Sequence, residues 1–156
     1  MSWKTWKGKP LDQGLNDVLE RDITKELSNG NAIKLCVGTD SQVKNGTITY
    51  ATVVVILRFK KGGFMYIRKT TGHSNITLKH RMIEEVGKSV AVAYEVSPIV
   101  KKYKVPMEVH ADINANPQFL SHVALKEAMG YIVGMGFVFK AKPDAFASSS
   151  CADKFV

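Results

Sequence analysis

The chain has 156 residues, a length at which one domain can bury a hydrophobic core without disulfides or a structural metal. Its 22 Lys and Arg residues exceed its 14 Asp and Glu residues, and the net charge of +8 favours polyanionic partners such as nucleic acid or an anionic membrane surface. No apolar run reaches the roughly 18 to 20 residues of a membrane helix. This argues against a protein that spans a membrane.

The two cysteines and the N-terminal sequence indicate a cytoplasmic protein. Cys36 and Cys151 lie in apolar surroundings without CxxC spacing, which predicts reduced, packed thiols. The sequence MSWKTWKGK lacks the apolar run of a signal peptide. We therefore expect a cytoplasmic location.

Residues 1–30 are predicted to form a basic lead and a helix that packs on the main domain, which spans residues 31–156. The helix is indicated by apolar residues at helical spacing and by Asn29-Gly30, which is a C-terminal stop signal. These apolar residues are Leu11, Leu15, Val18, Leu19, Ile23 and Leu27.

Three consecutive antiparallel strands are predicted next. The sequence IKLCVGTD, residues 33–40, is typical of a buried strand, and Asn45-Gly46 supplies the positive φ angles of a tight hairpin turn. A second strand is expected over about residues 47–59, and a third over residues 64–69 after the turn Lys-Lys-Gly-Gly.

The remainder of the chain alternates helices with strands. Helical spacing covers residues 77–96, and the sequence MEVHADI, residues 107–113, alternates faces as a strand does. Asn116-Pro117 is typical of a helix start, and this helix is expected to end near Gly134 or Gly136. A last strand, residues 136–141, precedes a weakly helical segment, residues 144–156.

The order β-β-β-α-β-α-β-α predicts an α/β fold with a mixed five-stranded sheet flanked by helices. Helical crossovers are right-handed and make later strands parallel, so we expect the fourth strand beside the first. The two hairpin strands then extend the sheet on the other side of the first strand.

Two aspartates stand where ligands collect in such sheets, beyond the carboxyl ends of neighbouring parallel strands. Asp40 ends the first strand in VGTDSQ, and Asp112 lies near the end of the fourth in HADIN. Taken singly, each is more typical of turn or capping chemistry than of a ligand. Taken together on adjacent strands, they would converge, and a hard cation with oxygen ligands relieves the repulsion.

Further acidic ligands are available in the helix after the hairpins and in the C-terminal segment. Glu85 shares the inward helical stripe with Met82 and Ser89, whereas Glu84 falls on the solvent side, where an ion pair with Lys88 accounts for it. A water-exposed boundary position is the alternative for Glu85. In the C-terminal segment Asp144 is typical of a helix cap, and Asp153, within Ala, Ser and Cys residues, is the better ligand candidate.

The motifs VGTDSQ, RMIEEV, VHADIN and KPDAFASSSCADK follow one another between about residues 33 and 154. With the predicted elements, they resemble the bacterial YkuK-like family of the ribonuclease H-like superfamily. The resemblance implies a ribonuclease H-like fold with acidic ligands at Asp40, Glu85, Asp112 and Asp153. One residue of ambiguity leaves Glu84 open. The chain ends three residues after Asp153, so Asp144 stays an alternative or additional ligand.

The same resemblance implies a cofactor and a mechanism. Two Mg²⁺ or Mn²⁺ ions, roughly 4 Å apart, would activate water and stabilise the leaving oxygen of a phosphodiester. Asp40 would bridge both ions, Asp112 and Glu85 would complete one site, and Asp153, with or without Asp144, the other. His110 shares a strand face with Asp112 and could relay protons, although a hydrogen-bonded structural histidine is the simpler interpretation.

Three functions fit these residues. The favoured one is a metal-dependent nuclease that acts on RNA, DNA or a hybrid. The second is a nucleic-acid-binding or assembly module with the same fold and no catalysis, and the third is a phosphohydrolase of small nucleotides. Metal binding separates the second from the others, and substrate length separates the first from the third.

Two basic regions could contact nucleic acid. In the lead, Lys4, Lys7 and Lys9 surround Trp3 and Trp6, which could stack on bases. The favoured interpretation is that the tryptophans anchor the lead to the domain or to a partner subunit. A second set around the later hairpin could follow phosphates or protect the sheet edge from aggregation. It consists of Arg58, Lys60, Lys61, Arg68 and Lys69.

Overall fold

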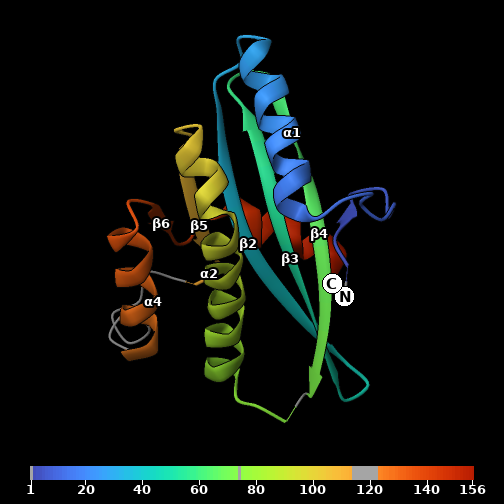
Figure 1. The fold of residues 1–156 in the computed structure, drawn as a ribbon. Coiled ribbons are helices and arrows are strands. Elements are labelled where there is room, and N and C mark those ends of the chain that lie inside the picture. The colour runs from blue at the N-terminus through green and yellow to red at the C-terminus, as the bar shows by residue number, and fades with distance from the viewer. Residues whose placement is uncertain (1, 74, 114–122) are drawn as a thin grey trace.

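A computed structural model of the chain describes residues 2–73, 75–113 and 123–156, and its centre is a mixed six-stranded sheet (Figure 1). The strand order across the sheet is β1-β4-β3-β2-β5-β6. The strands are β1 (Lys4–Thr5), β2 (Ile33–Lys44), β3 (Thr47–Arg58), β4 (Gly62–His73), β5 (Met107–Ala111) and β6 (Val138–Lys140). The predicted α/β class and mixed sheet are confirmed.

Strands β2, β3 and β4 form the predicted antiparallel meander. Asn45 and Gly46 have φ angles of 50° and 77°, as a tight hairpin turn between right-twisted strands requires. Strand β3 agrees with its predicted range, whereas β2 and β4 are longer than predicted, because antiparallel pairing continues to the hairpin turn and joins Lys44 to Thr47 and Thr47 to His73. Asp40 therefore lies within β2 and not at its end, which corrects the boundary predicted from the sequence.

The parallel half of the sheet follows the predicted topology. Strand β5 pairs in parallel with β2, and β6 pairs in parallel with β5. The sixth strand was not expected: β1, in the basic lead, pairs antiparallel with β4 through Lys4 and Thr5. Two residues are too few to show a strand periodicity in sequence, so only the pairing with β4 reveals this edge.

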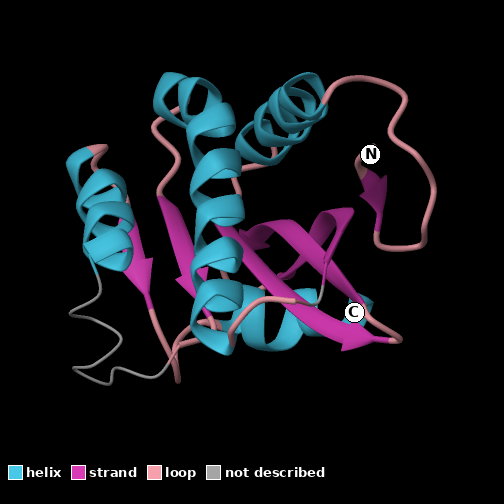
Figure 2. Cartoon of the chain, turned by 90° about the horizontal axis from the view of Figure 1, so that it is seen from below, coloured by secondary structure: helices cyan, strands magenta, loops and turns pink. Residues whose placement is uncertain are grey.

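Helices α1 (Leu15–Ser28) and α2 (Leu78–Lys102) cover one face of the sheet, and α4 (Val123–Gly134) lies beside α2 (Figures 1 and 2). The predicted end of α2 near residue 96 is wrong. The helix passes Pro98 because the Ser97 hydroxyl donates a 2.8 Å hydrogen bond to the Tyr94 carbonyl, the acceptor that proline cannot use.

The helix start expected at Asn116-Pro117 lies outside the described residues. Within the described ranges, every helix falls short of the length and apolar character that crossing a membrane requires.

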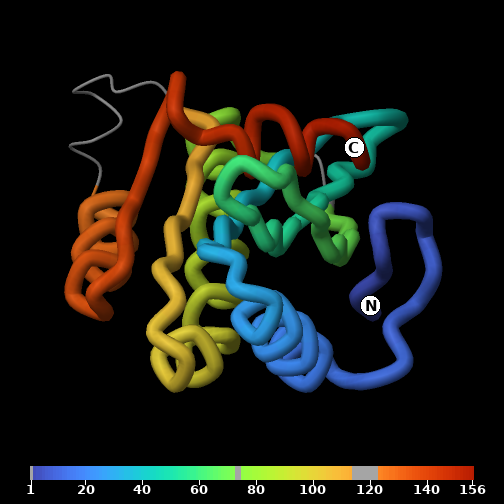
Figure 3. Tube along the Cα trace, turned by 90° about the horizontal axis from the view of Figure 1, so that it is seen from above, coloured from blue at the N-terminus to red at the C-terminus, as the bar shows by residue number. Residues whose placement is uncertain are grey.

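The C-terminal segment covers the other face of the sheet (Figures 2 and 3). It contains a π-helical turn, η1 (Ala147–Cys151), followed by a 3₁₀ turn, η2 (Ala152–Phe155). The core is therefore divided between two faces. Leu19, Val37 and Val96 are buried on the α1 and α2 side, whereas Cys36, Val53 and Ala147 are buried beneath the C-terminal segment.

Candidate active site

The sheet register brings Asp40 and Asp112 together. The parallel ladder between β2 and β5 ends with the pair Thr39 and Ala111, and the two aspartates are the next residues along the chain, Asp40 within β2 and Asp112 directly after β5. Thr39 and Ala111 point to the α2 side, where Thr39 bonds Ser89, so the aspartates point to the opposite face. Asp40 is 8% exposed, and the Asp112 side chain is 23% exposed.

Glu85, in the first turns of α2, lies near Asp40 and Asp112. It is 8% exposed, and its Oε2 accepts a 2.9 Å hydrogen bond from the Ser41 hydroxyl. Arg81, one turn earlier, holds Ser41 in place, since its Nε and Nη2 donate to the hydroxyl and carbonyl oxygens at 2.6 and 2.7 Å. Glu85 is thus tied to the residue that follows Asp40.

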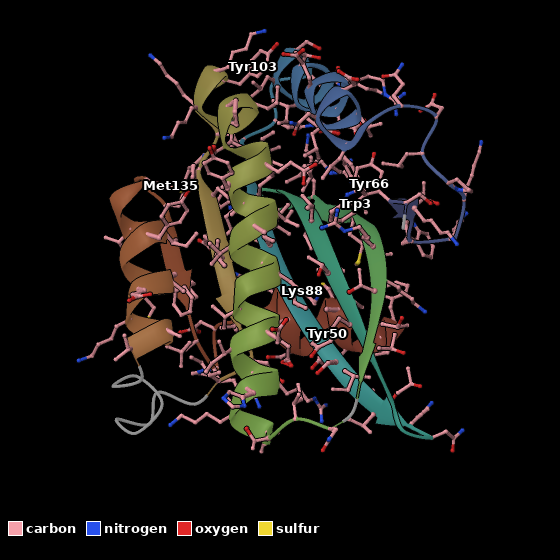
Figure 4. The ribbon with its side chains drawn as sticks, turned by 60° about the horizontal axis from the view of Figure 1, so that its bottom comes forward. Trp3, Tyr50, Tyr66, Lys88, Tyr103 and Met135 are labelled. Carbon is pink, nitrogen blue, oxygen red and sulfur yellow. The ribbon has the colours of Figure 1, made fainter. Side chains whose placement is uncertain are left out.

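Glu84 points to solvent, as the helical spacing predicts. The expected ion pair between Glu84 and Lys88 is wrong for the described residues. The Lys88 ammonium lies 4.8 Å from the centroid of the Tyr50 ring, as Figure 4 illustrates. Tyr50 lies on β3, which contacts α2, and the face of its ring attracts the ammonium group.

The C-terminal segment contributes to the same edge from the opposite face. The Ser149 hydroxyl donates a 3.0 Å hydrogen bond to Asp112 Oδ1, and the side chain of Asp153 lies close enough to Asp40 to raise the pKa of that carboxyl. Asp144 is exposed, and its backbone N–H bonds the Ala141 carbonyl. Among the described contacts of Asp40, Glu85 and Asp112, Asp153 takes part and Asp144 does not.

Burial, together with the nearby acids, raises the pKa values of two of these carboxyls. Burial is the main cause that lifts the pKa of Glu85 to about 8, and the charges of Asp40 and Asp112 add to it. Burial also raises the pKa of Asp40 to about 6, together with the hydrogen bond to Asp153 and the charge of Asp112. The carboxylates therefore repel one another and hold protons unusually strongly.

Lys142 neutralises part of this charge. Its ammonium lies 2.9 Å from Asp112 Oδ1, and the hydrogen bond to Asp112 raises the pKa of the lysine. The side chain remains 44% exposed. A cation that binds Asp112 at this oxygen would compete with Lys142, which is free to move into solvent.

A second set of possible ligand atoms lies deeper on the same face of β2 and β5. One atom each of Cys36, Glu108 and His110 lie within 4.8 Å of one another. Among the described residues this is the tightest such group, and the four acids are spread more widely, as carboxylates that repel one another are.

The contacts of this deeper group already use its polar atoms. His110 Nδ1 accepts the Ala147 N–H at 3.1 Å, so Nε2 carries the proton that is donated to Glu108 at 2.9 Å. Lys34 and Lys140 pair with the same carboxylate at 3.0 and 3.5 Å. Burial raises the pKa of Cys36 to about 12, which keeps it a thiol. His110 thus links β5 to the C-terminal segment.

Several residues of this edge were not singled out by the sequence. Ser41, Arg81, Lys142 and Ser149 all contact one of the acids or its partner. Ser41 and Arg81 stand next to predicted ligands in the motifs VGTDSQ and RMIEEV, which is the signal that could have identified them. Lys142 and Ser149 depend on how the C-terminal segment crosses the sheet.

The basic residues predicted around the hairpin of β3 and β4 do not form one surface. Arg58 pairs with Glu26 at 3.6 Å, and Arg68 stacks over Trp3 at 4.8 Å, both on the α1 side of the sheet. Lys61 bonds Asn31 at 2.9 Å. Alternation along β4 sends Lys69 to the opposite face, which is the face of Asp40.

The carboxylates of Asp40, Glu85, Asp112 and Asp153 offer hard oxygen ligands, which suit Mg²⁺ and Mn²⁺. The sequence matches the family described as Ribonuclease H-like over residues 18–156. A comparison with curated proteins gives no match.

Proposed function

Because the chain belongs to the ribonuclease H-like family, we propose that it is a nuclease that hydrolyses phosphodiester bonds of nucleic acid with Mg²⁺ or Mn²⁺. The family by itself supports a nucleic-acid-related function. The proposal adds catalysis, the metal and the residues, with Asp40, Glu85, Asp112 and Asp153 as the ligands.

The observation that carries the proposal is the convergence of acids from four separate segments at one edge of the sheet. Glu85 and Asp40 have raised pKa values because they are buried and lie near further carboxylates. Such an arrangement opposes folding unless protons or cations neutralise it. Residues that oppose folding and yet gather at one place in the fold are typical of a functional site.

Neighbouring side chains hold the acids in place. Ser41 orients Glu85 by donating to its Oε2, and Arg81 in turn fixes Ser41. Ser149 orients Asp112 from the C-terminal segment. Bound Mg²⁺ or Mn²⁺ would supply charge stabilisation to the attacked phosphate and lower the pKa of water. The exposed Lys142 beside Asp112 offers a positive charge to a phosphate.

The test compares wild-type protein with Asp112→Asn on labelled single strands, duplexes and hybrids of RNA and DNA with Mg²⁺ or Mn²⁺. We expect wild type to cleave at least one polynucleotide. We expect Asp112→Asn to lower the rate by on the order of 100-fold or more, because an amide is a poor ligand for a hard cation. Thermal unfolding checks that the variant is folded.

Asp17→Asn is the matched control, since Asp17 lies exposed on α1, on the other side of the sheet, and should leave the rate unchanged. Cleavage that survives in Asp112→Asn would contradict the proposal and indicate a contaminant. Binding of polynucleotides without turnover in wild type would favour a binding module. Hydrolysis confined to mononucleotides would favour a small-nucleotide phosphohydrolase.

A further inference from the structure

A cavity of about 520 Å³ lies at the edge of the sheet, where the basic lead, strand β4 and the C-terminal end meet. Figures 1 and 3 show the lead curling beside β4, with the C-terminal segment crossing the neighbouring face. The residues that define its character are Lys4, Trp6, Lys7, Ile67, Lys69 and Phe155.

The two tryptophans of the lead have different roles. Trp3, labelled in Figure 4, is 8% exposed and packs in the α1 core. The Arg68 guanidinium lies 4.8 Å from the centroid of its ring, so Trp3 anchors the lead to the domain. Trp6 is 56% exposed and lines the cavity. The Lys7 ammonium lies 5.2 Å from the centroid of its ring. An exposed indole beside a cation is able to stack on a base while the cation contacts a phosphate.

The charged residues that line the cavity are all basic. Lys4, Lys7 and Lys69 line it, and no acidic residue is found among the described residues that do so. The remaining wall is apolar, with Ile67 and Phe155. A ligand that matches this lining combines a flat aromatic part with a negative charge, as a nucleotide does.

The sheet register relates this cavity to the acids. Asp40 pairs with Ala51, and Ala51 pairs with Lys69, so the three residues form one row across the sheet on one face. Two strand spacings separate Asp40 from Lys69, which is about 10 Å. On the same face, η2 carries Asp153 near its start and Phe155 at its end. A chain of nucleotides that lies along this row reaches both places.

We propose that this cavity binds an unpaired nucleotide of the strand whose phosphodiester lies at Asp40 and Asp112. The base stacks on Trp6, and Lys7 and Lys69 contact its flanking phosphates. A base that is paired within a duplex cannot present its face to Trp6, so the site selects single strands or unpaired ends. This inference rests on the proposed function, because it places the substrate of the same site.

The test uses the full chain carrying Asp112→Asn, without divalent metal, so that binding is measured apart from cleavage. Tryptophan fluorescence is titrated with a short single strand, a blunt duplex, a mononucleotide and inorganic phosphate. We expect the single strand to quench Trp6 while buried Trp3 keeps its emission. Trp6→Ala should weaken binding of the single strand by about 5- to 100-fold, the range for one stacked base. Lys69→Gln should weaken it and lower its salt dependence.

Phe59→Ala is the matched control, because Phe59 is also an exposed aromatic with a lysine over its ring, but it lies in the turn between β3 and β4. It should bind as tightly as the parent protein. Equal affinity of Trp6→Ala and Phe59→Ala would overturn the inference, as would a duplex or a mononucleotide that binds as tightly as the single strand. If wild-type protein cleaves no polynucleotide and the single strand still quenches Trp6, this site is upheld while the nuclease proposal fails.

Discussion

Glu85 is buried against Ser41 and Arg81, with further carboxylates nearby, and this position makes its ionisation costly. Burial raises its pKa to about 8, whereas its neighbour Glu84 is exposed. A carboxyl in this position destabilises the folded chain whenever it is ionised without a cation. Its stability cost and its proposed metal-binding role therefore have the same physical origin.

Substituting Glu85 should separate these two effects. Glu85→Gln keeps an oxygen that accepts the Ser41 hydrogen bond but removes the buried charge. We expect the metal-free protein at pH 8 to unfold at the same or a higher temperature, and the cleavage rate to fall by on the order of 10- to 100-fold. Thermal unfolding and a cleavage assay measure the two quantities.

The same substitution at the neighbouring position is the control. Glu84→Gln should leave both the unfolding temperature and the cleavage rate unchanged, since its side chain is in solvent. If Glu84→Gln lost activity and Glu85→Gln kept it, the assignment of the ligand on α2 would be reversed.

The C-terminal segment is the element on which the site depends most. A Cβ atom on Gly38 would lie 2.5 Å from the backbone nitrogen of Ser148 and 2.6 Å from the Ala147 carbonyl carbon. Only glycine allows this approach of two backbones. The approach also places Ala147 against His110 and Ser149 against Asp112. The glycine in VGTDSQ is therefore explained by packing and not by contact with a ligand.

Gly38→Ala should displace the C-terminal segment. Because the clashing atoms belong to the backbone, we expect a loss of about 1 to 3 kcal/mol in the free energy of unfolding. Cleavage should fall as well, since Ser149 and Asp153 move away from their partners. Denaturant unfolding and the cleavage assay check this expectation.

Gly87→Ala serves for comparison, because its added Cβ meets no atom within 4 Å on helix α2. It should stabilise the helix by up to about 1 kcal/mol and keep activity. Equal stability of the two alanine variants would show that the close approach at Gly38 is not a determinant of the fold.

At the scale of the whole molecule, the acids around Asp40 and Asp112 form a negative cluster in a chain whose net charge is +8. A carboxyl whose pKa is raised on folding stabilises the folded state when it is protonated. This contribution is complete below the pKa of the unfolded state, which is 3.8 for Asp40 and 4.5 for Glu85. That contribution is lost as the pH rises through the folded values of about 6 and about 8. These two groups therefore make the metal-free protein less stable as the pH rises across this window.

Metal binding should act in the opposite direction. Mg²⁺ binds deprotonated carboxylates, so we expect it to raise the unfolding temperature more at pH 8.5 than at pH 5.5. Unfolding in EDTA and in excess Mg²⁺ at both pH values measures the difference. Burial also lowers the pKa of His110, so the comparison is made against Glu85→Gln. A Mg²⁺ effect that is the same at both pH values, or the same in the variant, would count against a metal at these acids.

Local sequence patterns determined the order of the elements and the direction of their side chains. Alternation along β5 predicted that Glu108, His110 and Asp112 share one face, and the contacts of these residues agree. Helical spacing in α2 predicted that Glu85, not Glu84, points inward, and the burial agrees. Both features depend on a repeat of two or 3.6 residues, which a short stretch of sequence contains in full.

The tertiary structure decided the features that join distant segments. The approach of Asp153 to Asp40, the hydrogen bond from Ser149 to Asp112 and the pairing of β1 with β4 each bring together residues far apart in the chain. Such contacts produce no repeat of two or 3.6 residues in the sequence. They depend on steric fit between backbones, as at Gly38 and Ser148, and on the register of a sheet in which Asp40, Ala51 and Lys69 fall in one row.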